Sequence, residues 1–258
     1  MLRTCWQVCE QLHLHPYLIC GSALGAVKYQ GFIPWDDDID IALIRPEYER
    51  FLQQAPAMLP SHFFVQNART DPAFPQLYSK LRLNNTSFIE ERAAHLPIHH
   101  GVYIDLFPLD GMPPNRIAAF CLQQRVLLCK WKLLSAFGEG GGSRERLLRK
   151  LGRLLGLHKH TARAIHRAER IISRYPPSKD GFWCCHGNWG IRFDLAPAAQ
   201  YGNGVSARFE GLNVRIPAQF ESYLTQRYGN WRMEPPISQQ HGRSAAIDLH
   251  SDHLWRKP

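Results

Sequence analysis

The sequence of 258 residues has no long hydrophobic run and no low-complexity segment. No segment approaches the ~20 consecutive apolar residues of a transmembrane helix, which argues against a chain that crosses a membrane. Near the N-terminus, Gln7, Glu10 and Gln11 interrupt the stretch in which a signal peptide needs an unbroken apolar segment. We therefore expect a cytoplasmic protein.

The number and spacing of the cysteines also argue against a secreted fold that is held by disulfides. The seven cysteines are odd in number, irregularly spaced, and include no Cys-x-x-Cys pair. A disulfide framework is not expected in a chain of this length. The cluster Cys184, Cys185 and His186 leaves two interpretations open. These residues are either reduced structural side chains or part of a zinc site whose remaining ligands the sequence does not identify.

The composition is that of a folded protein, because 45% of the residues are hydrophobic and 21% are charged. The net charge of +9 is concentrated in one region. Between Lys130 and Asp180 there are thirteen Lys or Arg and four acidic residues, whereas the rest of the chain is balanced. This region lacks the interleaved aromatic residues that stack on bases, so no nucleic-acid partner is expected.

Short helices and strands alternate in the first half of the chain. Periodicity and turn residues predict helices over 3–13, 22–30 and 46–54, and strands over 17–20, 39–44, 62–66, 78–83, 86–89 and 102–107. After Pro113-Pro114 the pattern predicts helices over 115–137, from Arg144 and over 161–174, then a hairpin around Gly211 and a helix over 218–228. We expect an α+β fold with a mixed sheet flanked by helices, a helical basic insertion and an irregular C-terminal part. The expected domains are a catalytic core over 1–113, a helical basic region over 114–178 and a C-terminal part over 179–258.

Four aspartates, Asp36, Asp37, Asp38 and Asp40, fall within five residues. Along a strand, side chains i and i+2 share a face, so Asp38 and Asp40 are expected to project together. Asp36 joins them if the strand extends back that far, and Asp37 then points away. Neighbouring carboxylates repel unless a cation joins them or one is protonated. Mg²⁺ prefers oxygen ligands and bridges to phosphates, which predicts metal-assisted phosphate chemistry.

Two further features fit such a site. Asp105 lies within the apolar stretch 102–107, where an acid needs a partner that a shared metal would supply. Gly21 and Ser22 precede an expected helix, where a close backbone and a hydroxyl can hold a phosphate. Ser22 is also available as a helix cap. Each feature alone has a structural interpretation, as an ordinary surface pair, an edge residue or a cap.

Several segments resemble the LicD family, which includes bacterial phosphocholine transferases and is related to fukutin and the fukutin-related protein. The strongest likeness lies in Gly21–Val27 and Gly31–Ile41, with its Trp-Asp-Asp-Asp-Ile-Asp block. The similar segments that follow are 80–86, 89–91, 99–110, 209–211, 223–225, 228–229, 235–236 and His241. The resemblance therefore extends over nearly the whole chain.

The resemblance implies a nucleotidyltransferase-like fold in which aspartates hold Mg²⁺. By analogy Asp38, Asp40 and Asp105 are the main metal carboxylates, with Asp36 as a further ligand. The implied reaction moves phosphocholine or a polyol phosphate from a CDP-activated donor to a sugar hydroxyl. The acceptor is a cell-surface glycan such as lipopolysaccharide, teichoic acid or capsule, free or carried on a lipid.

Basic and histidine residues near the site keep two interpretations each. Lys80 and Arg82 lie two apart on an expected strand and either hold the donor phosphates or form a solvated face. His99 and His100 precede the Asp105 strand, where we favour a structural role over catalysis.

Two other functions of the protein stay open. One is a true nucleotidyltransferase that releases pyrophosphate, and the other is a non-catalytic glycan- or membrane-binding protein.

The basic region contains an amphipathic helix with leucines on one face and basic residues on the other. The leucines are 147, 148, 151, 154 and 155, and the basic residues are Arg146, Arg149, Lys150 and Arg153. We favour an arrangement in which the leucine face packs on the catalytic domain and the arginines are solvated. The alternative is docking to anionic lipid headgroups or an acidic glycan, with the protein peripheral at the inner membrane face.

Overall fold

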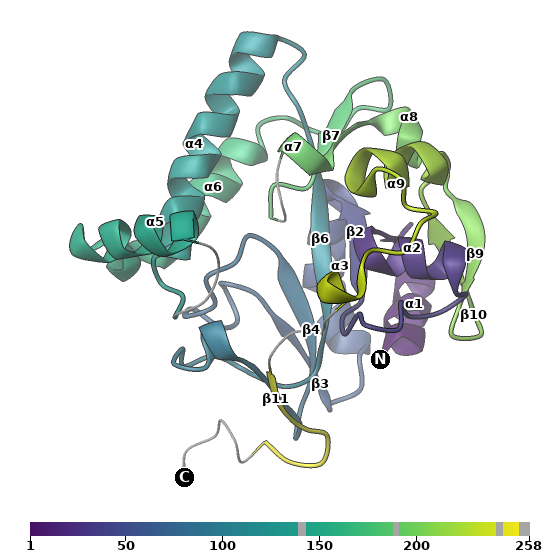
Figure 1. The fold of residues 1–258 in the computed structure, drawn as a ribbon, viewed down its shortest axis with the longest axis horizontal. Coiled ribbons are helices and arrows are strands. Elements are labelled where there is room, and N and C mark those ends of the chain that lie inside the picture. The colour runs from purple at the N-terminus through teal and green to yellow at the C-terminus, as the bar shows by residue number, and fades with distance from the viewer. Residues whose placement is uncertain (139–142, 188–190, 241–244, 253–258) are drawn as a thin grey trace. The chain divides into compact units, whose positions relative to one another are not determined.

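The computed structural model describes residues 1–138, 143–187, 191–240 and 245–252, so His241 lies outside the described residues (Figure 1). The chain divides into two compact units. The first unit consists of Met1–Pro60, Ile104–Met112 and Pro176–Arg243. The second consists of Ser61–Tyr103, Pro113–Tyr175 and Ser244–Pro258. Each unit therefore combines segments that are distant in sequence.

The first unit is built on a mixed sheet. Its strands are β1 (Tyr17–Leu18), β2 (Asp40–Ile44), β6 (Tyr103–Gly111, in this unit from Ile104), β7 (Phe182–Cys184) and β8 (Leu195–Pro197). β2 pairs antiparallel with β1 and parallel with β6, while β7 pairs antiparallel with β6 and β8. Every residue of β6 is buried, as is typical of a strand covered on both faces.

Helices and a hairpin complete this unit. They are α1 (Leu2–Gln11), α2 (Cys20–Lys28), α3 (Arg45–Met58), α7 (Ile191–Asp194), α8 (Ala198–Tyr201), the strands β9 (Val205–Phe209) and β10 (Leu212–Ile216), α9 (Phe220–Tyr228) and the 3-10 turn η3 (Ile237–Gln239). Four apolar side chains of β2 and β6 are at most 1% exposed, namely Ile41, Leu43, Leu106 and Leu109. The strands that carry the aspartates are therefore fixed by a buried core.

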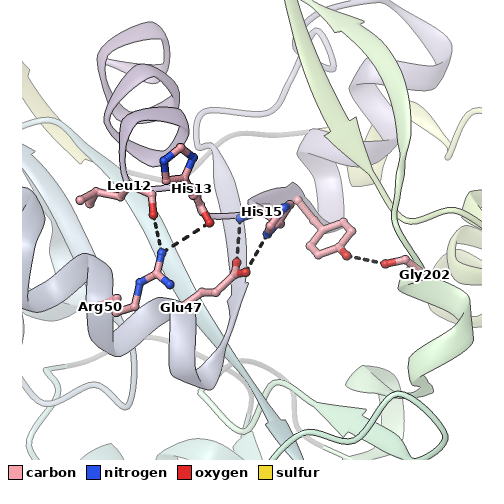
Figure 2. A network of polar contacts seen from close by, with 7 residues as sticks. Leu12, His13, His15, Glu47, Arg50 and Gly202 are labelled. Carbon is pink, nitrogen blue, oxygen red and sulfur yellow. Dashed lines mark hydrogen bonds and ion pairs between the residues drawn. The ribbon is translucent and has the colours of Figure 1, made fainter.

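Polar side chains of α3 bind the connection between α1 and β1 (Figure 2). The carboxylate of Glu47 accepts hydrogen bonds of 2.7 Å from the backbone N–H and from Nδ1 of His15. Arg50 donates to the carbonyls of Leu12 and His13. These contacts satisfy carbonyls at the end of α1 that have no partner within the helix. They fix the point at which the chain enters the sheet.

The second unit has two strand pairs and a group of helices. β3 (Phe63–Gln66) pairs antiparallel with β4 (Ser79–Leu83), and β5 (Ser87–Glu90) with β11 (Ala245–Asp248). The helical elements are η1 (Glu91–Ala93), α4 (Arg116–Leu134), α5 (Ser143–Leu154), η2 (Leu157–His160) and α6 (Thr161–Ile172). Asn115 caps the start of α4, because its side chain accepts hydrogen bonds from two backbone N–H groups, and α4 packs along α6. Among the described helices none has the length and apolar content to cross a bilayer.

The predicted α+β fold with a mixed sheet, flanking helices and an irregular C-terminal part is confirmed, and most predicted elements lie within a few residues of those observed. Several boundaries were wrong. The strand predicted over 17–20 ends at Leu18, and the helix predicted from Ser22 begins at Cys20. The strand predicted over 102–107 continues to Gly111. The short strands β7, β8 and β11 escaped prediction, because three or four residues carry too little periodicity and are defined by their partners.

Candidate active site

Asp40 and Asp105 lie side by side in the first unit because β2 and β6 pair in parallel register. Asp40 is the Cα partner of Asp105 in this ladder. The backbone N–H of Asp105 donates to the carbonyl of Ile39 over 2.8 Å, which fixes the register at this point. Two carboxylates from distant parts of the chain are thereby brought together.

Asp38 completes a group of three carboxylates. One oxygen from each of Asp38, Asp40 and Asp105 lies within 4.8 Å of the others. The three residues are 7%, 9% and 3% exposed, so little solvent screens their mutual repulsion. Such a group is stable when a cation or a proton is shared among its members. The donor set consists of oxygens alone, which fits a hard divalent cation such as Mg²⁺.

A second group contains Asp36, Asp37 and Asp38, again with one oxygen each within 4.8 Å. Asp38 belongs to both groups. The prediction of a strand beginning at Ile39 was wrong by one residue, since β2 begins at Asp40 and residues 36–39 form a loop. Strand alternation therefore does not separate Asp37 from its neighbours as expected. Asp36 and Asp37 are both more exposed than Asp38.

Gly21 provides space for the carboxylate of Asp36. A Cβ atom at position 21 would lie 2.2 Å from Oδ2 of Asp36, well inside van der Waals contact. Only glycine permits this approach without moving the acid. Gly21 was predicted from the sequence to bind phosphate, and the structure adds that the absence of a side chain there leaves room for the carboxylate of Asp36.

Ser22 does not cap α2 as predicted, because it lies within the first turn and the residue at the N-cap is Ile19. Its hydroxyl oxygen instead accepts the backbone N–H of Asp40 over 2.8 Å. Both partners are buried, so this bond satisfies a strand donor that water does not reach. Ser22 thus connects α2 directly to the strand that carries Asp40.

The tip of the β9–β10 hairpin supports the loop that leads into the aspartates. Glu210 donates its backbone N–H to Gln30 over 2.9 Å, and its carboxylate accepts the N–H of Phe32 over 3.2 Å. Phe32 also packs edge-on against Phe209 with ring centroids 5.1 Å apart. Glu210 was not among the candidate residues. The signal that points to it is the segment Phe209–Gly211 in the family resemblance.

α9 anchors the beginning of α2. The backbone N–H of Cys20 donates to the hydroxyl of Tyr223 over 3.0 Å, and Cys20 adopts a positive φ of 52°. Burial raises the pKa of the Cys20 thiol well above its ordinary value. Nearby, Arg227 of α9 forms a buried ion pair with Asp194. The bond from Tyr223 holds the strained residue that precedes Gly21 and Ser22.

Lys80 and Arg82 lie in the second unit and are 2% and 3% exposed, so a solvated strand face is wrong. Arg82 donates from Nε to Gln66 over 2.7 Å and from Nη1 to the carbonyl of Gly101 over 2.6 Å. The Lys80 ammonium lies 3.2 Å from the ring centroid of Tyr103, a cation–π contact. Both are buried cations, and their assignment to donor phosphates stays a prediction.

His99 and His100 hold the loop before β6. His99 accepts the N–H of Gly101 at Nδ1 over 3.0 Å, so its Nε2 carries the proton and donates to Asn84 over 2.9 Å. Nε2 of His100 lies 3.1 Å from the carbonyl of Leu96. These bonds support the structural role favoured from the sequence.

All seven cysteines lie in the described residues, and none forms a disulfide.

Residues 14–113 match the family model described as LicD/FKTN/FKRP, nucleotidyltransferase domain. Within residues 14–113 the chain is therefore similar to the nucleotidyltransferase domains of this family. The matched residues include every predicted magnesium ligand and substrate-binding residue, from Gly21 to Asp105. The suspected resemblance to the LicD family is thus confirmed.

A curated relative extends the likeness beyond residues 14–113. The chain is 24% identical over 247 residues to the lipopolysaccharide cholinephosphotransferase LicD of Haemophilus influenzae. The match covers 90% of this chain and 88% of the relative. The similarity therefore includes the basic helices and the C-terminal part as well as the aspartates.

Proposed function

We propose that this chain is a phosphotransferase that moves phosphocholine or a polyol phosphate from a CDP-activated donor to a sugar hydroxyl of a cell-surface glycan. The transferase class is confirmed by similarity to the Haemophilus cholinephosphotransferase along nearly the whole chain. A glycan acceptor is consistent with the lipopolysaccharide in the name of that relative. The CDP donor follows from the chemistry expected of the family.

The observation that carries the proposal is the buried group of Asp38, Asp40 and Asp105. We assign Mg²⁺ to these three carboxylates, with Asp36 as an accessory ligand, because the oxygens lie within reach of one ion. When bound, the ion would offset charge on the donor phosphates and on the CMP leaving group. Burial strengthens this effect, since the local dielectric is low.

Side chains of the first unit provide the other functions of the site. One carboxylate of the group orients the acceptor hydroxyl and takes up its proton as the new ester bond forms. Ser22 holds the backbone of Asp40, and Glu210 holds the loop before Asp36, so the acids are positioned before substrate arrives. Preorganised charges need no rearrangement during the reaction.

Incubation of the full chain with a panel of CDP-alcohols, an acceptor glycan and Mg²⁺ tests the proposal, with CMP as the measured product. Asp38→Asn is expected to abolish CMP release, whereas Asp180→Asn, at an exposed position outside the group, is expected to retain it. Release of pyrophosphate from a nucleoside triphosphate would instead support a true nucleotidyltransferase. Unchanged CMP release by Asp38→Asn would overturn the assigned site.

A further inference from the structure

Five leucines that lie on one side of α5 and just after its end form an exposed apolar surface, called here the leucine face. Their exposed fractions are 58% for Leu147, 37% for Leu148, 42% for Leu151, 83% for Leu154 and 63% for Leu155. The arrangement favoured from the sequence is therefore wrong for the leucines, which do not pack inward, while Arg146, Lys150 and Arg153 are exposed as expected.

The opposite face of α5 packs on the end of α4. A Cβ atom at Gly152 would lie 2.7 Å from Cβ of Ser135, so the two helices approach as closely as glycine allows. Nε1 of Trp131 donates to the carbonyl of Leu148 over 2.7 Å. Arg153 donates from Nε to the carbonyl of Ser135 over 3.2 Å. Turning the leucines inward would break this contact and place bulkier side chains where glycine now fits.

Arg149 lies on the same inward face. It is 4% exposed, and its guanidinium lies 3.6 Å from the carboxylate of Glu145. Glu145 is the one acidic residue of α5, and its carboxylate pairs with Arg149 on the inward side. Within α5, whose residues are all described, the outward side therefore combines leucines with basic residues and carries no acidic residue.

α6, in the same unit, buries its apolar face. Its side chains Ala164, Ile165, Ala168, Ile171 and Ile172 are buried, while Arg163, Arg167 and Arg170 are exposed. α5 has a similar composition but the reverse orientation. The leucine face is thus an exposed apolar surface that its own unit does not cover, which marks an interaction site.

Charge selects the partner of this surface. Arg144, Arg146 and Lys150 are exposed on α5 near the leucines. A second copy docked through the same face would bring like charges together. We propose that the leucine face docks into the headgroup–acyl boundary of a bilayer rich in anionic lipid, with these basic residues on the lipid phosphates. This proposal goes beyond the transfer reaction and does not depend on catalysis.

Flotation of the full chain with phosphatidylglycerol-containing vesicles, and separately with phosphatidylcholine vesicles, tests the proposal. Preferential recovery with the anionic vesicles is expected. Leu151→Ser/Leu154→Ser/Leu155→Ser should lower the partition coefficient about tenfold or more, because it removes the apolar side chains that enter the boundary. These leucines are exposed, so the variant is expected to fold. The matched pair Leu154→Ser and Ile237→Ser compares leucine and isoleucine at 83% and 85% exposure, and only the first should weaken binding.

Three outcomes would overturn the proposal. The first is equal recovery with anionic and neutral vesicles, and the second is unchanged binding by the triple serine variant. The third is a dimer in light scattering that the triple variant converts to a monomer, which would assign the face to a second copy. CMP release in solution by the triple variant reports on the transfer reaction separately, so each proposal can fail alone.

Discussion

Asp40 and Asp105 are direct neighbours across the parallel pair β2–β6. This relationship turns an acid isolated in an apolar strand into one member of a carboxylate group that also includes Asp38. Because the three carboxylates are buried, they repel one another strongly, and a bound cation would relieve this repulsion. The first prediction follows from that repulsion.

Mg²⁺ is expected to raise the melting temperature of the wild-type chain, because it binds the folded group and not the unfolded chain. At a concentration 100-fold above its dissociation constant, the stabilisation is about 2.7 kcal/mol. Asp40→Asn and Asp105→Asn should lose this shift in melting temperature. In the absence of metal, both variants should melt no lower than the wild type, since each removes one repelling charge. Asp180→Asn is the control that should keep the shift. A wild-type chain indifferent to Mg²⁺ in differential scanning fluorimetry would contradict the assignment.

Ser22→Ala should destabilise the first unit by about 1–3 kcal/mol, since it leaves the buried N–H of Asp40 without its acceptor. Urea unfolding monitored by fluorescence measures the change. Ser206→Ala, at an exposed position of β9, is expected to stay within about 0.5 kcal/mol of wild type. Equal stabilities of the two variants would show that this hydrogen bond contributes nothing.

Gly21→Ala and Gly25→Ala should affect different properties, the first lowering activity and the second lowering stability. The added methyl group at position 21 meets the end of the Asp36 side chain at 2.2 Å, which can rotate away. At position 25 it meets the backbone carbonyl of Gly31 at 2.3 Å, which cannot. We therefore expect Gly25→Ala to cost about 1–3 kcal/mol of stability. Gly21→Ala should leave the melting temperature nearly unchanged and lower the rate of CMP release. The reverse ranking would contradict the contacts described at these glycines.

Stability should decline on acidification because of His100. Burial lowers the pKa of its imidazole below the ordinary 6.5. The hydrogen bond to Leu96 opposes that change, Arg82 adds to it, and Asp71 and Glu90 act against it. The unfolded chain thus binds the proton at higher pH than the folded one. The contribution to the unfolding free energy is constant above pH 6.5 and decreases as the pH falls below 6.5 towards the folded pKa.

His100→Gln removes the titrating group and should flatten the dependence of unfolding free energy on pH below 6.5. His158→Gln, at an exposed histidine of η2, should keep the wild-type slope. Denaturant titrations at several pH values between 5 and 8 provide the measurement. Parallel curves for wild type and His100→Gln would remove His100 as the origin of the effect.

Local patterns were sufficient for much of this structure. The positions of α1, α3, α4, α6 and α9 followed from helical periodicity and turn residues, because these signals lie within one segment. The aspartate loop and the Gly-Ser element were visible for the same reason. The division into domains over 1–113, 114–178 and 179–258 and the role of Mg²⁺ remain predictions.

The sequence by itself determined which residues share a helix face or a strand, since backbone geometry repeats every 3.6 or 2 residues. It did not determine which face turns inward, because that depends on what each element meets. Thus Gly152 against Ser135 turned the leucine face of α5 outward. Likewise, only the parallel pairing of β2 with β6 placed Asp105 beside Asp40. Contacts between distant segments, which no local period encodes, decided both.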